Sequence, residues 1–172
     1  VENVDVLYGE MSGKYHREGQ ISFDGATGIL THVTNDSVKL AKNKFMKADL
    51  RAKVMNSGNL HATFSFDMLS KNGAYSYAGS LKPMQAPAFN RILTPLLNVE
   101  IGSGNIRGIR FTMEGNDYRT WGDFRFDYDN LKINLLNEEG EKKKKKLLSF
   151  LVNQLVIDDS NPDANEVYHI GK

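Results

Sequence analysis

The amino-acid sequence predicts a mostly β (α+β) protein built on a curved, groove-like antiparallel meander of about eight strands, with two short helices. Apolar and polar residues alternate with a period of two over most of the chain. Clusters of Gly, Asn and Asp separate the alternating runs, and helical spacing of apolar residues is confined to two short stretches. At 172 residues the chain suffices for one core, so we expect a single β-rich domain over residues 1–172.

The first half of the chain carries weak strand signals followed by strong ones. The alternating runs are residues 4–8, 21–23, 29–33, 47–54, 60–68 and 75–81. The run at 47–54 alternates most cleanly, and the polar residues 56–59 after it predict a hairpin loop. Asn72-Gly73 is a favoured hairpin dipeptide because both residues tolerate positive φ. We therefore expect consecutive strands to pair as neighbours.

Helical spacing appears between Pro83 and Asn98 and again at residues 147–157. Pro95 would interrupt a continuous helix, whereas Thr94 is a suitable N-cap with Pro95 at the first helical position. We therefore expect two short helical pieces in the first stretch, with a step before Pro95. The second stretch follows the charged connector 138–146 and predicts one short helix.

The stretch 99–136 has the clearest pattern, which we interpret as three strands at 109–114, 124–128 and 131–135. Turn clusters at 115–117 and 129–130 separate them. The glycine-rich residues 102–108 resemble a phosphate-binding loop, but Arg107 occupies the third glycine position and no helix follows. A tight turn between strands fits this segment better. We expect a last strand at 167–170.

Motifs for catalysis, metals and cofactors are not found. The four histidines are scattered without metal-ligand spacing, and there is no nucleophile elbow or calcium loop. The chain contains no Cys, so disulfides and thiolate metal sites are excluded. The net charge of +1 does not suit a nucleic-acid-binding protein. We predict no enzyme activity, no cofactor and no metal. An enzyme on this scaffold would need facing carboxylates on neighbouring strands, an arrangement that has no sequence motif.

A polybasic run precedes the second helical stretch. It consists of Lys142, Lys143, Lys144, Lys145 and Lys146. Such a run can contact anionic lipid headgroups. A solvated connector is the favoured alternative, since acidic residues directly precede the lysines.

The remaining signal is the apolar face of the predicted sheet. An uncovered apolar trough would bind acyl chains, whereas a closed sheet would use the same residues as its core. The candidate lining residues are Phe64, Phe66, Ile109, Phe111, Met113, Phe124, Phe126 and Tyr128.

The order of elements from residue 60 to 165 resembles the C-terminal part of AsmA-like envelope proteins, including TamB, in the form found in Bacteroidetes. The similarity rests on a Gly-led strand ending at Leu81, a short helix closing at Leu97, and a strand containing Ser103-Gly104. It continues with the turn Gly115–Tyr118, the sequence Tyr128–Lys132 and the loop with Asn161-Pro162. The chain begins at Val1 without Met, and we expect a segment of a larger protein.

This resemblance implies a periplasmic segment of an inner-membrane-anchored envelope protein. It implies roles in lipid transport and outer-membrane biogenesis, and the family offers no catalytic motif to transfer. The first hypothesis is therefore a non-enzymatic module that binds or conducts the acyl chains of phospholipid, or of another acyl-chain lipid, along its apolar face. The second is a structural module that contacts the rest of its parent chain and other envelope proteins through sheet edges. The third is an enzyme on an unfamiliar β scaffold.

Overall fold

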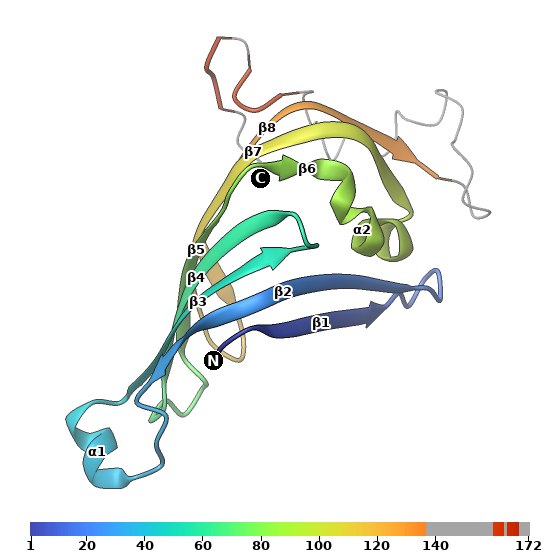
Figure 1. Cartoon of the computed structure of the whole chain (residues 1–172). Coiled ribbons are helices and arrows are strands. Elements are labelled where there is room, and N and C mark those ends of the chain that lie inside the picture. The colour runs from blue at the N-terminus through green and yellow to red at the C-terminus, as the bar shows by residue number, and fades with distance from the viewer. Residues whose placement is uncertain (137–159, 164, 169–172) are drawn as a thin grey trace. The chain divides into compact units, whose positions relative to one another are not determined.

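An eight-stranded sheet dominates the computed structural model, which describes residues 1–136, 160–163 and 165–168 (Figure 1). The strands are β1 (Val4–Met11), β2 (Glu18–Thr31), β3 (Phe45–Val54), β4 (Gly58–Asp67), β5 (Tyr75–Leu81), β6 (Met84–Gln85), β7 (Val99–Gly115) and β8 (Thr120–Leu135). Their order is β1-β2-β3-β4-β5-β7-β6, and β8 pairs with β7. The pairs from β2 to β7 whose register is defined are antiparallel. The expected mostly β fold is confirmed, while its groove-like form stays a prediction.

Two short helices accompany the sheet in the described residues, α1 (Ser37–Lys42) and α2 (Asn90–Leu97). The sequence predicts no helix where α1 forms. Asp36 begins α1 as its N-cap, because its carboxylate accepts hydrogen bonds from the backbone N–H groups of Val38 and Lys39. The helix expected at 147–157 lies outside the described residues, as do part of the loop with Asn161-Pro162 and part of the strand expected at 167–170. Val167 and Tyr168, which are described, are not in a strand.

The predicted step before Pro95 is wrong. The break falls earlier, where a 3-10 turn at Ala86–Phe89 meets α2, and Pro95 lies inside α2. Proline removes one backbone donor, and α2 ends only two residues later, so little of the helix depends on that donor. Asn98 ends α2 in the left-handed conformation with φ 57°.

Three strands are longer than the sequence predicted. The runs 21–23 and 29–33 fall mainly within the single strand β2, and the expected turn at 102–108 lies inside β7. The expected turn at 129–130 lies inside β8, so the predicted three-stranded meander is a pair of long strands. Gly104 and Asn130 nevertheless have positive φ, of 143° and 52°. Irregular positions within a strand favour the same residues as turns do, which explains the error.

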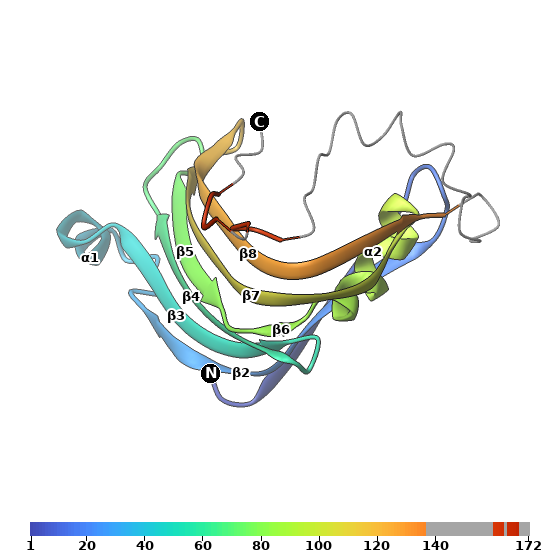
Figure 2. The same ribbon diagram turned by 90° about the horizontal axis from the view of Figure 1, so that it is seen from above.

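The chain divides into two compact units that alternate along the sequence. Unit 1 comprises Val1–Val6, Phe23–Lys82 and Ile109–Arg125, and unit 2 comprises Leu7–Ser22, Pro83–Gly108 and Phe126–Lys172. Strands β3, β4 and β5 form the centre of unit 1, where they lie side by side with α1 near one end (Figure 2). The single domain expected from the sequence stays a prediction.

Unit 2 has the more deeply buried core of the two. Ile106 is only 2% exposed, and Met84, Ala86, Ile101 and Leu131 are also buried. Helix α2 packs closely on Gly19 of β2: a Cβ there would lie 2.7 Å from Leu96 Cγ. Any larger residue at position 19 would push α2 away, so this glycine is required for the contact.

Candidate functional site

One face of unit 1 collects the aromatic residues of three adjacent strands. Phe64 of β4 lies opposite Tyr77 of β5, and Tyr77 lies opposite Met113 of β7. Residues directly opposite each other share a face of the sheet, so these three side chains lie on one side. The same register places Phe66 opposite Tyr75, and Phe111 opposite Gly79. We call this surface the aromatic face; it comprises Phe64, Phe66, Tyr75, Tyr77, Phe111 and Met113.

The rings of the aromatic face contact one another across the strands. The centroids of Phe64 and Tyr77 are 6.0 Å apart, and those of Tyr77 and Phe111 are 5.8 Å apart with the rings at 62°. Along β4 the rings of Phe64 and Phe66 stack with centroids 6.2 Å apart. These are the distances and arrangements that aromatic pairs prefer. The face is therefore a connected apolar layer rather than a set of isolated rings.

Glycines beside the rings allow them to lie low on the sheet. A Cβ added at Gly79 would lie 2.5 Å from Cζ of Phe111, and one at Gly115 would lie 2.7 Å from Cζ of Tyr75. Each ring therefore covers the backbone of the glycine on the neighbouring strand, an arrangement known to stabilise glycines within sheets.

The aromatic face is half-buried within unit 1. Its six residues are neither buried nor fully exposed, whereas the small residues beside them, Ala48 and Ala62, are 7% and 5% exposed. Helix α1 belongs to the same unit but buries none of its residues, so it does not cover this face.

The opposite face of the same strands is polar. Thr63 lies opposite Ala78, which lies opposite Thr112; Ser65 lies opposite Ser76. A depression of about 340 Å³ is lined mostly by residues of this polar side, namely Lys47, Thr63, Ser65, Ser76, Ala78, Thr112 and Glu114. Three residues of the aromatic face, Phe64, Tyr77 and Met113, also line it. The two sides of unit 1 thus differ sharply in polarity.

The structure brings together five of the eight predicted lining residues. Ile109 lies opposite Leu81, in the register that places Phe111 and Met113 on the aromatic face beside Phe64 and Phe66. Phe124 belongs to unit 1 and is 59% exposed.

Phe126 and Tyr128 belong to unit 2 instead. Their ring centroids are 4.8 Å apart, and Tyr128 is only 6% exposed. The backbone of Tyr128 pairs with that of Asn161 in an isolated antiparallel bridge, so this residue is part of a core. Lys142–Lys146, for which the sequence leaves membrane contact and a solvated connector as alternatives, lie outside the described residues.

Sequence reasoning did not include Tyr75 and Tyr77 among the site residues, although they connect β4 to β7. The Asn72-Gly73 signal indicates that β4 and β5 are neighbours. A two-residue turn there would place Tyr75 opposite Ser70, whereas the longer connection in the structure places the two tyrosines opposite the two phenylalanines.

Several carboxylates of the described residues pair with bases rather than with one another. Asp49 lies 2.9 Å from His61 Nε2, and Asp129 lies 3.4 Å from Arg107 Nε. The hydrogen bond from Lys44 Nζ, of 2.6 Å, lowers the pKa of Asp67 below its ordinary value.

A second depression of unit 1, about 530 Å³, is lined by Asp5, Asp24, Gly25, Thr27, Arg51, Ala52, Lys53, Asn56 and Asn59. Its lining carries both signs of charge. Within the described ranges, three or more potential metal ligands do not come together anywhere.

Comparisons with known proteins identify no relative: no family model, no curated protein and no solved structure matches this chain. Among the helices of the described residues, none is long and apolar enough to cross a membrane. The choice of the aromatic face as the candidate site therefore rests on the geometry of this structure and not on a related protein.

Proposed function

We propose that this chain is a non-enzymatic module of a bacterial envelope protein, and that its aromatic face binds the acyl chains of phospholipids. The observation that carries the proposal is the connected layer of half-exposed rings, with centroids 5.8–6.2 Å apart, on one side of β4, β5 and β7. An acyl chain offers only apolar contacts, and a continuous apolar surface is what it requires.

The length of the apolar strip suits one acyl chain. Along β4, the side that carries Phe66 and Phe64 continues through Ala62 to Leu60. These six residue steps span roughly 20 Å at about 3.3 Å per residue. One acyl chain spans half of a hydrocarbon core about 30 Å thick, or roughly 15 Å. Burying apolar surface contributes about 25 cal/mol per Å², so contact along the whole strip, rather than any one ring, would supply the affinity.

The resemblance of residues 60–165 to AsmA-like proteins supports the cellular setting. On this proposal the chain is a periplasmic segment of an inner-membrane-anchored protein that supports lipid transport and outer-membrane biogenesis. Its partners would be phospholipid, the rest of its parent chain and other envelope proteins.

Native mass spectrometry of gently purified protein, followed by lipid extraction, tests the proposal. We expect co-purified phospholipid with wild type, and its loss with Phe64→Asp and Met113→Asp. Thr63→Asp and Thr112→Asp are matched controls: they add the same charge to the same strands, but on the opposite face. Circular dichroism establishes that each variant is folded. A wild-type protein that is free of lipid and takes up no added phospholipid would refute the proposal.

A second candidate function rests on β1. This strand lies at one end of the strand order, and all eight of its residues are exposed. It contains neither Lys nor Pro, the residues that commonly protect an edge. On this alternative the chain is an interaction module that pairs β1 with a strand of another protein. A photo-crosslinker at Leu7 would capture that partner, whereas one at the polar-face residue Thr112 would not.

A further inference from the structure

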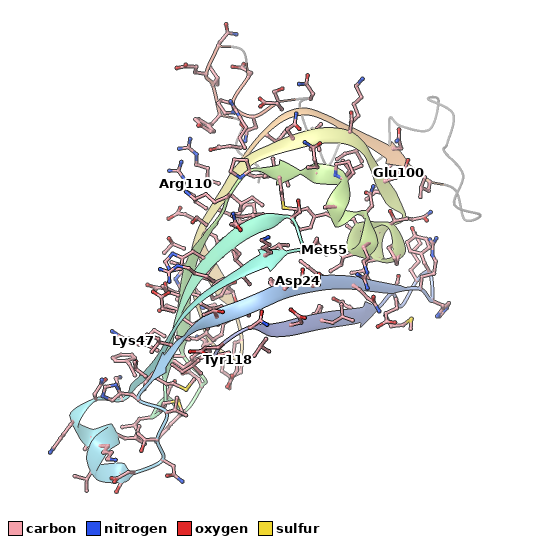
Figure 3. The ribbon with its side chains drawn as sticks, viewed as in Figure 1. Asp24, Lys47, Met55, Glu100, Arg110 and Tyr118 are labelled. Atoms are coloured by element: carbon pink, nitrogen blue, oxygen red, sulfur yellow. The ribbon has the colours of Figure 1, made fainter. Side chains whose placement is uncertain are left out.

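One end of unit 1 gathers three connections between strands. They join β2 to β3, β4 to β5 and β7 to β8, and each belongs entirely to unit 1. The backbone N–H of Met68 donates to the carbonyl of Lys44 at 2.9 Å, and that of Asp117 donates to the carbonyl of Asn72 at 2.9 Å. The three connections are thereby linked to one another. We call residues 32–46, 67–74 and 116–121 together the apex; α1 and Tyr118 within it are labelled in Figures 1 and 3.

The apex exposes an unusual number of large apolar side chains. Val33 and Val38 are each 65% exposed, Leu69 is 56% exposed and Tyr118 is 85% exposed. The others are Phe45, Met68 and Trp121, between 39% and 48% exposed. The turn between β3 and β4, at the other end of these strands, exposes the polar residues Asn56 and Ser57 instead. Loop tips of a folded protein rarely carry so much apolar surface unless it contacts something.

The apex is also basic. It contains five basic residues, namely Lys39, Lys42, Lys44, Lys71 and Arg119, against the three acids Asp36, Asp67 and Asp117. Two of the acids already have partners within the apex. Asp36 accepts hydrogen bonds as the N-cap of α1, and Asp67 forms an ion pair with Lys44 at 2.6 Å. Two of the bases lie over apolar rings, Lys44 over Phe45 at 5.1 Å and Arg119 over Trp121 at 5.3 Å. Cationic and apolar groups therefore lie directly beside each other in two of the three connections.

We propose that the apex is a membrane-contact site that binds the surface of a bilayer containing anionic phospholipid. Trp and Tyr favour the boundary between headgroups and acyl chains, where Tyr118 and Trp121 would lie. Val33, Val38 and Leu69 supply apolar contact below the headgroups, and the lysines supply attraction to anionic lipid. Charge complementarity decides the occupant, since the net positive charge of the apex matches an anionic surface. This site is separate from the aromatic face and does not depend on acyl chains binding there.

Sedimentation with lipid vesicles tests the role of the charges. The complete 172-residue chain is mixed with vesicles of phosphatidylcholine alone, or of phosphatidylcholine with phosphatidylglycerol. We expect binding to the anionic vesicles that weakens as salt is added. Each lysine near such a surface contributes about 1 kcal/mol, so Lys39→Gln, Lys42→Gln and Lys71→Gln combined should weaken binding about a hundred-fold.

A second triple variant is the matched control. This variant, Lys53→Gln, Lys82→Gln and Lys132→Gln, also removes three positive charges, but from exposed positions outside the apex. This control should bind anionic vesicles within about threefold of wild type. If both triple variants lose binding equally, only net charge matters and the apex proposal fails.

Trp121 provides a direct readout, because it is the one tryptophan in the sequence. Its fluorescence should shift to the blue on binding anionic vesicles and should be quenched by phospholipids brominated on their acyl chains. Val38→Ser and Leu69→Ser combined should reduce this quenching, and circular dichroism would establish that the variant is folded. Binding without any change in Trp121 fluorescence would place the contact elsewhere and overturn the proposal.

Substitution of Lys142–Lys146 by glutamine separates the apex from the polybasic run. Vesicle binding that is lost in this variant, and kept in the apex triple variant, would overturn the proposal in favour of the run. Failure of wild type to bind anionic vesicles would also overturn it. The acyl-chain proposal is tested apart from this, because the apex variants leave the aromatic face intact and should retain extracted phospholipid.

Discussion

Substitution of Gly79 by alanine tests whether the aromatic face depends on the close approach of ring and backbone. A Cβ at this position would lie 2.5 Å from Cζ of Phe111 and 2.7 Å from the carbonyl oxygen of His61. The ring can move, but the carbonyl belongs to the adjacent strand β4 and can move only with the sheet. Such overpacking typically costs about 1–3 kcal/mol, offset by about 0.4–1 kcal/mol because alanine restricts the unfolded chain. We therefore expect Gly79→Ala to lower the free energy of unfolding by about 1–2 kcal/mol.

Thermal melts followed by circular dichroism measure this change. For a protein of this size, 1 kcal/mol shifts Tm by about 2–4 °C, so Gly79→Ala should melt about 2–8 °C below wild type. Gly13→Ala is the control: a Cβ at position 13 meets nothing within 4 Å, and this variant should be as stable as wild type or slightly more stable. Phe111→Leu in the Gly79→Ala background should show coupling, because it removes the ring contact and keeps the carbonyl contact. If Gly79→Ala has the same Tm as Gly13→Ala, the reasoning is refuted.

Two further predictions concern single residues. Lys44 lowers the pKa of Asp67, so this carboxylate stabilises the native state above its unfolded pKa, and that contribution is lost as pH falls through the folded pKa. Wild type should therefore lose more Tm than Asp67→Asn between about pH 5 and about pH 2, and equal losses would contradict the prediction. Asn98 is 5% exposed, has φ 57° and donates from Nδ2 to the carbonyl of Leu136 at 3.0 Å. In urea melts, Asn98→Gly should lower the free energy of unfolding by about 1–3 kcal/mol, because the side-chain hydrogen bonds are lost. Asn98→Ala should lower it by about 1–2 kcal/mol more, because alanine, unlike glycine, is strained in the left-handed conformation. Equal losses in the two variants would contradict this prediction.

The central strands could be predicted from the sequence because their residues alternate without interruption. Lys47 to Val54 and Tyr75 to Leu81 follow a period of two, and the structure places strands β3 and β5 over these residues. The long strands β7 and β8 were divided because glycine and asparagine occur inside them as well as at real turns. A residue with positive φ is required in both situations, and local sequence does not distinguish them. Helix α1 was missed because its six residues are too few to show an apolar stripe.

The candidate site could be predicted only in part. Alternation assigned Phe64, Phe111 and Met113 correctly to one side of their own strands, but it gives no information on which strands are neighbours. Tyr77 connects Phe64 to Phe111 because β5 lies between β4 and β7, and that order follows from pairing across the chain. Phe126 follows Phe124 with the same alternation, yet it belongs to unit 2, because a strand of sixteen residues passes through both units.

The aromatic face and the apex lie on the same strands of unit 1, and their proposed roles can be tested separately. Asp67 ends β4 directly after Phe66, and Tyr75 begins β5 directly after Ala74, so the aromatic face starts where the apex ends. If the apex binds an anionic bilayer, Phe66 and Tyr75 are the residues of the face closest to the membrane surface. Transfer of phospholipid from vesicles to the protein should then require both surfaces, whereas binding of monomeric lipid from solution should require only the aromatic face. The apex triple lysine variant and Phe64→Asp distinguish these steps: the first should slow transfer and keep monomer binding, and the second should abolish both. Equal transfer by wild type and the lysine variant would show that the two surfaces do not act together.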